Sequence, residues 1–264
     1  MTGIASTEPS AKGCVIVTGG GRRIGRAVVE HLAANGWDVI VHFHRSAAEA
    51  EQVAQAARGL GVRAQALGCD LSDLQATAAF FAQCVQVMGS IQAVVNSAAL
   101  FEFDRGDQPD WALWQQHQDI NLRAPVQLAS LLHAQAPAAR RRCVVNVIDQ
   151  KVYNLNPDYF SYTISKIALE GVTRMLALEM GPHTRVCAVA PGITLHSGDQ
   201  TDANFDQAHR VTPLGRSSTP LDIAQAVAYL LQAEAVTGTT LVVDGGQHLF
   251  PLKRDIMFEI EPKP

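Results

Sequence analysis

The feature that most constrains the fold is a glycine-rich turn between an apolar run and a helical pattern. The run Cys14-Val-Ile-Val17 is typical of a buried strand, and the turn Thr18-Gly-Gly-Gly-Arg-Arg-Ile-Gly25 follows at once. Glycines let a backbone approach a ligand closely, and a helix N-terminus supplies N–H groups and positive potential. This order of elements therefore predicts a cradle for a pyrophosphate. The turn residues expected there are Gly19, Arg22, Arg23 and Ile24.

Apolar runs typical of strands alternate with helical patterns along the chain. The expected strands are 14–17, 39–43, 62–67, 93–96, 143–148, 185–190 and 239–243. The expected helices include 47–60, 74–88, 111–132, 160–180 and 220–232. Such alternation predicts an α/β fold with a parallel sheet. We therefore expect one Rossmann-like domain over residues 12–250, with a doubly wound parallel seven-stranded sheet and helices on both faces.

Three segments are expected to serve other purposes. Residues 1–11 are small and polar and predict a flexible lead-in. Residues 195–216 are polar and predict a mobile substrate lid. Metal binding by His196, Asp199 and His209 is an alternative there, but they lack tight ligand spacing, so no metal is expected. Residues 251–264 extend beyond the last strand, and either reach a neighbouring subunit or are disordered.

The composition is that of an ordinary enzyme. Of 264 residues, 47% are hydrophobic and 17% are charged, and the net charge of -4 gives no reason to expect nucleic acid as a partner. No apolar run reaches the roughly 18 to 20 residues that a membrane span needs. The five cysteines are scattered without a Cys-x-x-Cys pair, which favours buried free thiols in a reducing cytoplasm.

The ends of the second and third expected strands indicate the cofactor. An NAD site usually has an acidic residue after the second strand, whereas this chain has His44-Arg45-Ser46. A cation and a hydroxyl suit a ribose 2′-phosphate, so NADPH is the expected cofactor. A solvated loop cation is the alternative for Arg45. Asp70, followed by Leu71, either accepts from an adenine amine or caps the next helix, as Ser72 or Asp73 would.

Later strand ends are expected to shape the rest of the cofactor site. Small residues follow Asn96, and Ala98 among them lets a cofactor lie against the backbone. Phe101 either reaches the space above the cofactor or belongs to the core. The turn with Pro191, Gly192 and Thr194 is expected beneath the nicotinamide.

Tyr162 and Lys166 lie four residues apart and share one face of the expected helix. An ammonium near a phenol favours the phenolate, so we expect Lys166 to lower the pKa of Tyr162 into the range of a general acid or base. Asp149 ends the fifth strand, where polar residues face the ligand crevice. Asn121 lies inside a helical pattern, and its amide is expected to bend the helix and hold a water near Lys166.

These motifs together resemble the short-chain dehydrogenase/reductase family over roughly residues 12–250. They are Thr-Gly-x-x-x-x-x-Gly, Asn96-Ser-Ala98, Tyr162-x-x-x-Lys166, Pro191-Gly192 and Asp244-Gly-Gly246. The resemblance implies a catalytic tetrad of Asn121, residue 149, Tyr162 and Lys166, with Lys166 also at the cofactor. It also implies a homo-oligomer, often a tetramer, to which apolar faces of helix 160–180 and its predecessor are suited.

Two departures narrow the resemblance. Asp149 stands where the family usually has Ser, and Arg23 stands where the turn usually has its middle Gly. With His44 to Ala50, Phe101 and the Asp244 to Leu249 ending, these resemble pteridine reductases and bacterial dihydromonapterin reductases. The resemblance implies NADPH-dependent reduction of a dihydropterin: 7,8-dihydromonapterin, dihydrobiopterin or dihydrofolate.

The same resemblance assigns roles at the substrate. Asp149 orients the ring or delivers a proton together with Tyr162, because a pterin offers N–H donors that a carboxylate accepts. Phe101 and the nicotinamide sandwich the pterin, and Arg23 bridges the cofactor phosphate and the substrate. Tyr159 lines the pocket or lies at the surface. One alternative is a carbonyl or 3-oxoacyl reductase, and the missing Ser at position 149 argues against it. The other is a non-catalytic dinucleotide-binding sensor, and the intact Tyr162 and Lys166 argue against that.

Overall fold

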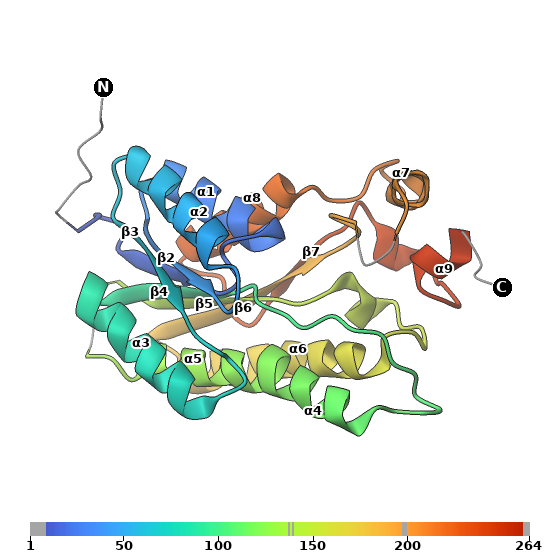
Figure 1. Ribbon diagram of the computed structural model, residues 1–264, viewed down its shortest axis with the longest axis horizontal. Coiled ribbons are helices and arrows are strands. Elements are labelled where there is room, and N and C mark those ends of the chain that lie inside the picture. Colours follow the sequence, from blue (N-terminus) through green and yellow to red (C-terminus); the bar gives the residue numbers. More distant parts are fainter. Residues whose placement is uncertain (1–8, 137, 139, 197–199, 261–264) are drawn as a thin grey trace.

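A computed structural model describes residues 9–136, 138, 140–196 and 200–260 (Figure 1). Its centre is a sheet of seven parallel strands in the order β3-β2-β1-β4-β5-β6-β7. The strands are β1 (Cys14–Val17), β2 (Asp38–Phe43), β3 (Ala64–Gly68), β4 (Ile91–Asn96), β5 (Arg142–Val147), β6 (Thr184–Pro191) and β7 (Thr240–Val243). The predicted fold class and all seven strands are confirmed, with boundaries that differ by at most a few residues.

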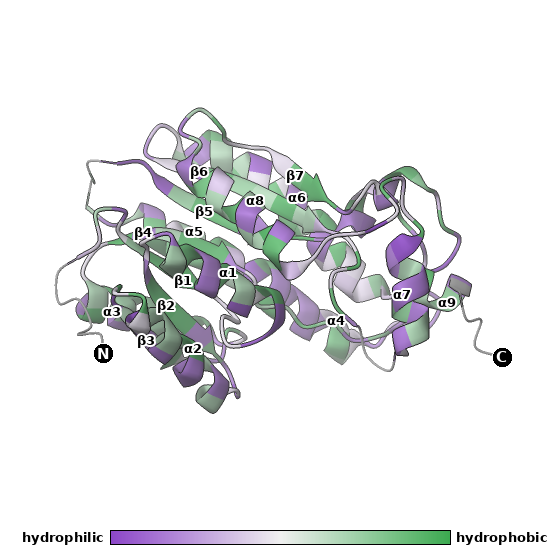
Figure 2. Ribbon diagram, turned by 90° about the horizontal axis from the view of Figure 1, so that it is seen from above, coloured by the Kyte–Doolittle hydropathy of each residue, from purple (hydrophilic) through white to green (hydrophobic). Residues whose placement is uncertain are grey.

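Helices cover both faces of the sheet (Figure 1). One face carries α1 (Arg23–Ala34), α2 (Ala47–Gly59) and α8 (Pro220–Gln232). The other carries α3 (Leu74–Met88), α4 (Trp111–Gln118), α5 (Ala124–His133) and α6 (Phe160–Met180). Two apolar clusters fill the layers between helices and sheet, and Figure 2 shows the hydrophobic colour concentrated along the strands. Burial of both faces explains why the strands are runs of Val and Ile rather than alternating sequences.

The strand order reverses between β1 and β4. In open α/β sheets, ligands bind outside the carboxyl ends of the strands at such a switch point. The turns after β1, β4, β5 and β6 meet there, which brings the sequence motifs together. Among the described residues, no helix combines the length and the apolar character that a membrane crossing requires.

The helix expected over 111–132 is interrupted in its middle. Between α4 and α5 the backbone takes a π-helical turn over Asp119–Arg123, with Asn121 buried inside it. The side chain of Asn121 accepts from the Leu100 N–H at 2.8 Å and donates to Ser165 Oγ at 3.1 Å. The amide thus ties the turn after β4 to α6, and the extra residue of the π turn lets it reach both.

Two short helices lie together at one end of the molecule, beyond the carboxyl edge of the sheet. These are α7 (Asp202–Arg210), in the segment predicted as a lid, and α9 (Ile256–Ile260), in the C-terminal extension. Figures 1 and 2 both show them side by side, and Asn204 Nδ2 donates to the Met257 carbonyl oxygen at 3.1 Å. The C-terminal extension therefore packs against its own chain through residue 260.

Candidate active site

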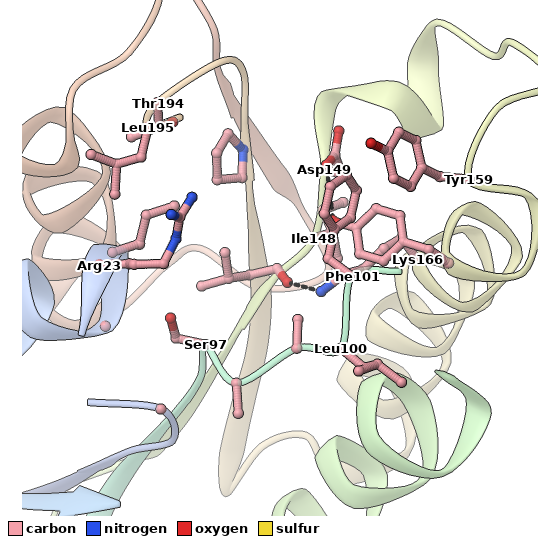
Figure 3. A pocket seen from close by; sticks show the side chains of 18 of the residues that line it. Arg23, Ser97, Leu100, Phe101, Ile148, Asp149, Tyr159, Lys166, Thr194 and Leu195 are labelled. Atoms are coloured by element: carbon pink, nitrogen blue, oxygen red, sulfur yellow. Dashed lines mark hydrogen bonds between the residues drawn. The ribbon is translucent and has the colours of Figure 1, made fainter. Parts of the chain in front are cut away.

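A cavity of about 710 Å³ opens at the carboxyl ends of the strands. It falls within the size range of small-molecule and cofactor sites. Most residues predicted for the site line it: Gly19, Arg22, Arg23, Ile24, His44, Ser46, Asp70, Leu71, Ala98, Phe101, Asp149, Tyr159, Tyr162, Lys166, Pro191, Gly192 and Thr194. Figure 3 shows Arg23, Thr194 and Leu195 on one side, facing Asp149, Phe101 and Tyr159 on the other.

Three predicted residues lie outside the lining. Arg45 is exposed beside the cavity, between His44 and Ser46. Asn96 is buried and donates to Asn146 Oδ1 at 2.8 Å, which couples β4 to β5. Asn121 is buried behind the cavity wall with the contacts described above. Asn96 and Asn121 thus hold the backbone that forms the wall.

The glycine-rich turn leaves the floor of the cavity bare. Gly19 has φ +65°, and a Cβ there would lie 3.1 Å from the Ala98 Cα. A Cβ on Gly25 would lie 2.3 Å from the Gly19 carbonyl oxygen, so the turn and α1 pack too closely for any side chain. No side chain caps the N-terminus of α1, and its first turn contains no acidic residue. The N–H groups and positive end of α1 therefore remain available to an anion.

Arg23 occupies a left-handed backbone conformation with φ +52°. This conformation explains why glycine is favoured at this position, because a Cβ is strained there. The Arg23 guanidinium donates to the His196 carbonyl oxygen at 2.8 Å, which joins the turn to the segment after β6. Arg23 therefore lies between the glycine-rich turn and the opposite wall.

The end of the cavity where the cofactor is expected to be selected is polar. His44 Nε2 lies 3.7 Å from Asp70 Oδ2, and Asp70 Oδ1 accepts from the Ser72 N–H at 2.9 Å. The Arg22 guanidinium pairs with Glu49. Asp73, rather than Asp70, accepts from the first N–H groups of α3, so the capping alternative for Asp70 is wrong.

His42 is a supporting residue that no sequence motif indicated. Its Nδ1 accepts from the Gly19 N–H at 3.1 Å, and its Nε2 lies 3.1 Å from the Cys69 carbonyl oxygen. Burial lowers the pKa of His42 to about 4. The ring is therefore neutral at pH 7, with its proton on Nε2, and it fixes the glycine-rich turn to the end of β3.

The candidate catalytic residues meet where the carboxyl end of β5 approaches the first turns of α6. The Tyr162 hydroxyl donates to Asp149 Oδ2 at 2.9 Å, and Asp149 Oδ1 accepts from the Lys151 N–H at 2.8 Å. Lys166 Nζ donates to the Val147 carbonyl oxygen at 2.8 Å and lies 5.6 Å from the centre of the Tyr162 ring. The predicted grouping of Tyr162, Lys166 and Asp149 is thus present.

The expected effect of Lys166 on Tyr162 is wrong. Burial raises the pKa of Tyr162 well above its ordinary value, and the charge of Asp149 raises it further. Burial also raises the pKa of Asp149 and lowers the pKa of Lys166 to about 8. The phenol hydrogen bonds to a carboxylate, whereas the ammonium is directed at a carbonyl oxygen. Tyr162 is therefore a protonated phenol at neutral pH, suited to donate a proton.

The aromatic residues at the mouth of the cavity contact one another. The rings of Phe101 and Tyr159 are stacked, with centroids 4.2 Å apart and an interplanar angle of 18°. The Phe101 ring also meets Tyr162 edge-on at 4.7 Å. Tyr159 is buried, which excludes the surface alternative, and it takes a left-handed backbone conformation with φ +54°. One face of Phe101 is thus covered by Tyr159.

Further lining residues come from segments that carried no motif. Lys151 is buried, its Nζ donates to the Asp158 carbonyl oxygen at 2.7 Å, and it lies 3.3 Å from Asp255 Oδ2. Asp255, Ile256 and Met257 line the cavity from the C-terminal extension. The lysine could be suspected from its position two residues after Asp149, but the extension carries no local signal.

The residues considered for a metal point to other partners. His196 Nε2 lies 3.0 Å from Asp202 Oδ1, and His209 Nε2 lies 3.1 Å from the Ser218 carbonyl oxygen. Asp199 lies outside the described residues. Within the part of the chain that the structure describes, no group of three or more His, Cys, Asp or Glu side chains is placed to hold a metal ion. The five cysteines, all described, are buried and unpaired, as predicted.

The chain is similar to known proteins over most of its length. The family model described as enoyl-(acyl carrier protein) reductase matches residues 20–248. Similar solved structures include FolM alternative dihydrofolate reductase 1 from Brucella canis complexed with NADP, which is 39% identical with a TM-score of 0.84. That alignment covers 90% of this chain and 94% of the other.

Curated relatives cover the same region. Short-chain reductase protein NovJ of Streptomyces niveus is 32% identical over 262 residues, covering 92% of this chain and 97% of NovJ. The 3-oxoacyl-(acyl-carrier-protein) reductase FabG of Staphylococcus aureus is 29% identical, covering 89% of this chain and 97% of FabG. The family model spans most of the chain, and the predicted motifs lie at one site. The chain therefore belongs to the short-chain dehydrogenase/reductase family.

Proposed function

We propose that the protein is an NADPH-dependent reductase of dihydropterins, such as 7,8-dihydromonapterin, dihydrobiopterin or dihydrofolate. The observation that carries the proposal is the hydrogen bond between Tyr162 and Asp149, at a position where related ketone reductases usually have Ser. A ketone site needs a hydroxyl to hold the carbonyl oxygen. A dihydropterin instead presents ring nitrogen and amine groups, for which a buried carboxyl group is a matching partner.

The cavity fits NADPH by its shape and its donors. The bare glycine floor and the uncapped N-terminus of α1 suit the pyrophosphate. Ser46 begins α2 without a side-chain capping bond, so its hydroxyl remains available beside Arg45 and Arg22 for a 2′-phosphate. Several solved relatives contain NADP, including the Brucella canis structure. When bound, NADPH supplies a hydride to the carbon of the substrate C=N bond.

The chain supplies the matching proton to the nitrogen of that bond. Tyr162 is protonated at neutral pH, and Asp149 holds a raised pKa, so the hydrogen-bonded pair can keep a proton in the buried site. Lys166 offsets part of the negative charge that develops on the pair when its proton leaves. Closure of the site by α7 would exclude water from this transfer.

The flat ring of a pterin suits the aromatic residues at the cavity mouth. Phe101 is 37% exposed, and it retains free area although Tyr159 covers one face. Arg23 faces Asp149 across the cavity and would contact the polar edge of the ring (Figure 3). The name of the Brucella canis protein, alternative dihydrofolate reductase, supports a pterin substrate for this chain.

The decisive experiment follows NADPH absorbance with 7,8-dihydromonapterin, dihydrofolate, biopterin and a simple ketone side by side, and repeats each with NADH. Consumption with dihydropterins and a preference for NADPH are the expected results. Tyr162→Phe is the control, because it removes the hydroxyl that contacts Asp149. Consumption with the ketone alone would reject the pterin assignment.

A carbonyl or 3-oxoacyl reductase is the second candidate. The 29% identity to FabG and the description of the family model favour it. The absence of a hydroxyl at position 149 weighs against it. The ketone arm of the experiment above separates the two candidates.

A further inference from the structure

We infer that the C-terminal segment Asp255 to Met257, anchored by Arg254, is part of the substrate site, and that Met257 limits the size of the substituent carried by the reduced carbon. The inference rests on the proposed function for the identity of the substrate. It goes beyond that function by assigning specificity to a segment that lies outside the family motifs.

The C-terminal segment lies at the candidate active site. Asp255, Ile256 and Met257 line the same cavity as Asp149 and Tyr162. Ile256 is buried and Met257 is half-buried, so the segment forms a wall rather than a loose tail. This wall closes the same cavity that holds the proton-donating pair.

Asp158 anchors the start of the C-terminal segment. The Arg254 guanidinium donates through Nε to Asp158 Oδ2 at 2.9 Å and through Nη2 to Asp158 Oδ1 at 2.8 Å. The Asp255 N–H donates to Asp158 Oδ2 at 2.7 Å. Asp158 is buried but Arg254 is partly exposed, so the anchor depends on the two-point contact between guanidinium and carboxylate and on the added backbone bond rather than on exclusion of water. The anchor fixes the backbone next to the wall residues.

The C-terminal segment also contacts the loop that follows Asp149. Lys151, two residues after Asp149, pairs with Asp255 at 3.3 Å and lies 5.3 Å from the centre of the Tyr159 ring. The Phe258 ring packs edge-on against Phe103 at 5.8 Å and stacks parallel to Tyr159 at 6.2 Å. The loop that positions Asp149 and the C-terminal wall are thus held as one unit.

The chemistry of the substrate supplies the last step. In a 7,8-dihydropterin, the carbon of the reducible C=N bond is the carbon that carries the side chain. Atoms of that side chain therefore begin one bond from the reaction centre, inside the cavity that Tyr162 and Met257 share. A short side chain fits within the wall, whereas the long tail of dihydrofolate must displace it.

The test compares Met257→Ala and Met257→Trp with wild type. The readout is the ratio of kcat/KM for dihydrofolate to kcat/KM for 7,8-dihydromonapterin, with the NADPH Kd measured by fluorescence. Removing several side-chain atoms should raise the ratio about fivefold or more, and the Trp variant should lower it. The NADPH Kd should not change, because the wall lies at the substrate end. Leu60→Ala, at a 56% exposed position just after α2, is the matched control.

Arg254→Ala tests the anchor without altering the lining. It should raise the KM for 7,8-dihydromonapterin and speed trypsin cleavage after Lys253, whereas Arg174→Ala, which also removes an exposed ion pair, should do neither. A ratio that stays within twofold of wild type in both Met257 variants would overturn the inference. If wild type reduces ketones alone, the pterin assignment fails, and the Met257 variants are then measured on a small and a bulky ketone. An unchanged size preference there overturns the wall as well.

Discussion

The hydroxyl of Tyr162 donates its hydrogen bond to Asp149 over 2.9 Å, and this bond decides how the site handles protons. A carboxylate next to a phenol stabilises the protonated phenol, which is the opposite of what an ammonium does. Lys166 lies nearby, but its donor reaches the Val147 carbonyl oxygen. The contacts therefore favour a protonated phenol at Tyr162 over a phenolate.

Replacing Asp149 by Ser should exchange one substrate class for another. We expect Asp149→Ser to lower kcat/KM for 7,8-dihydromonapterin about 100-fold, because the loss of one general acid–base group costs at least that much. Activity on a simple ketone should rise, since the hydroxyl can hold a carbonyl oxygen. Steady-state rates with both substrates check this. Unchanged pterin turnover would remove Asp149 from the catalytic assignment.

Asp149→Asn should shift the pH dependence of kcat/KM to lower pH. Reduction needs a protonated pair, so the rate falls as pH rises, and the loss of charge on Lys166 near its pKa of about 8 adds to this fall. The Asp149 charge raises the pKa values of both Tyr162 and Lys166. Removing it lowers both, so the alkaline limb of kcat/KM should shift to lower pH. Asp70→Asn, at the cofactor-selecting end, should leave the limb in place, and an upward shift in Asp149→Asn would contradict the assignment.

At Arg23, a Gly variant should be more stable than an Ala variant, whereas at an ordinary helical position the Ala variant is the more stable one. Its φ of +52° strains any side chain, so Arg23→Gly should be more stable than Arg23→Ala by about 1 kcal/mol. At Glu30, exposed in the middle of α1, Gly should instead be less stable than Ala by about 1 kcal/mol. Urea unfolding of the four variants measures both differences. If the Ala variant were the more stable one at both positions, the left-handed conformation at Arg23 would relax without loss of stability.

Cofactor preference should depend on Arg45 although it lies outside the cavity lining. A hydrogen bond to a charged phosphate contributes about 1.5 to 3 kcal/mol, so Arg45→Ala should raise the KM for NADPH about tenfold or more. The KM for NADH should stay the same, because NADH has no 2′-phosphate. Arg58→Ala, farther along α2, is the control. An equal loss with both cofactors would assign Arg45 to structure rather than selection.

The fold could be predicted because its determinants are local. Apolar runs, turn glycines and helical spacing lie within each element, and α3, α6 and α8 span the predicted residues. The grouping of Asp149, Tyr162 and Lys166 followed from strand ends and helix spacing. The direction in which the pKa of Tyr162 shifts could not be predicted in this way. It depends on which charged group contacts the hydroxyl, and the sequence does not show that contact.

The missed parts of the site share a second cause. Lys151 and Asp255 are 104 residues apart in sequence, and their contact requires the C-terminal segment to fold back over the site. The stack of Phe101 on Tyr159 likewise joins two loops whose approach no periodicity encodes. Such contacts arise from packing between elements rather than from any pattern within one element.

The exposed apolar side chains of α4 and α6 predict a homo-oligomer. Trp111 on α4 is 70% exposed, and Met175 and Leu178 on α6 are 67% and 87% exposed, although all three are large and apolar. The two helices pack side by side, so their outward faces form one layer that a second copy would cover. Light scattering should give the mass of a dimer or tetramer, and Leu178→Arg should reduce it. Leu60→Arg, at an exposed position beside α2, should not. A monomer mass for the wild-type protein would reject the oligomer.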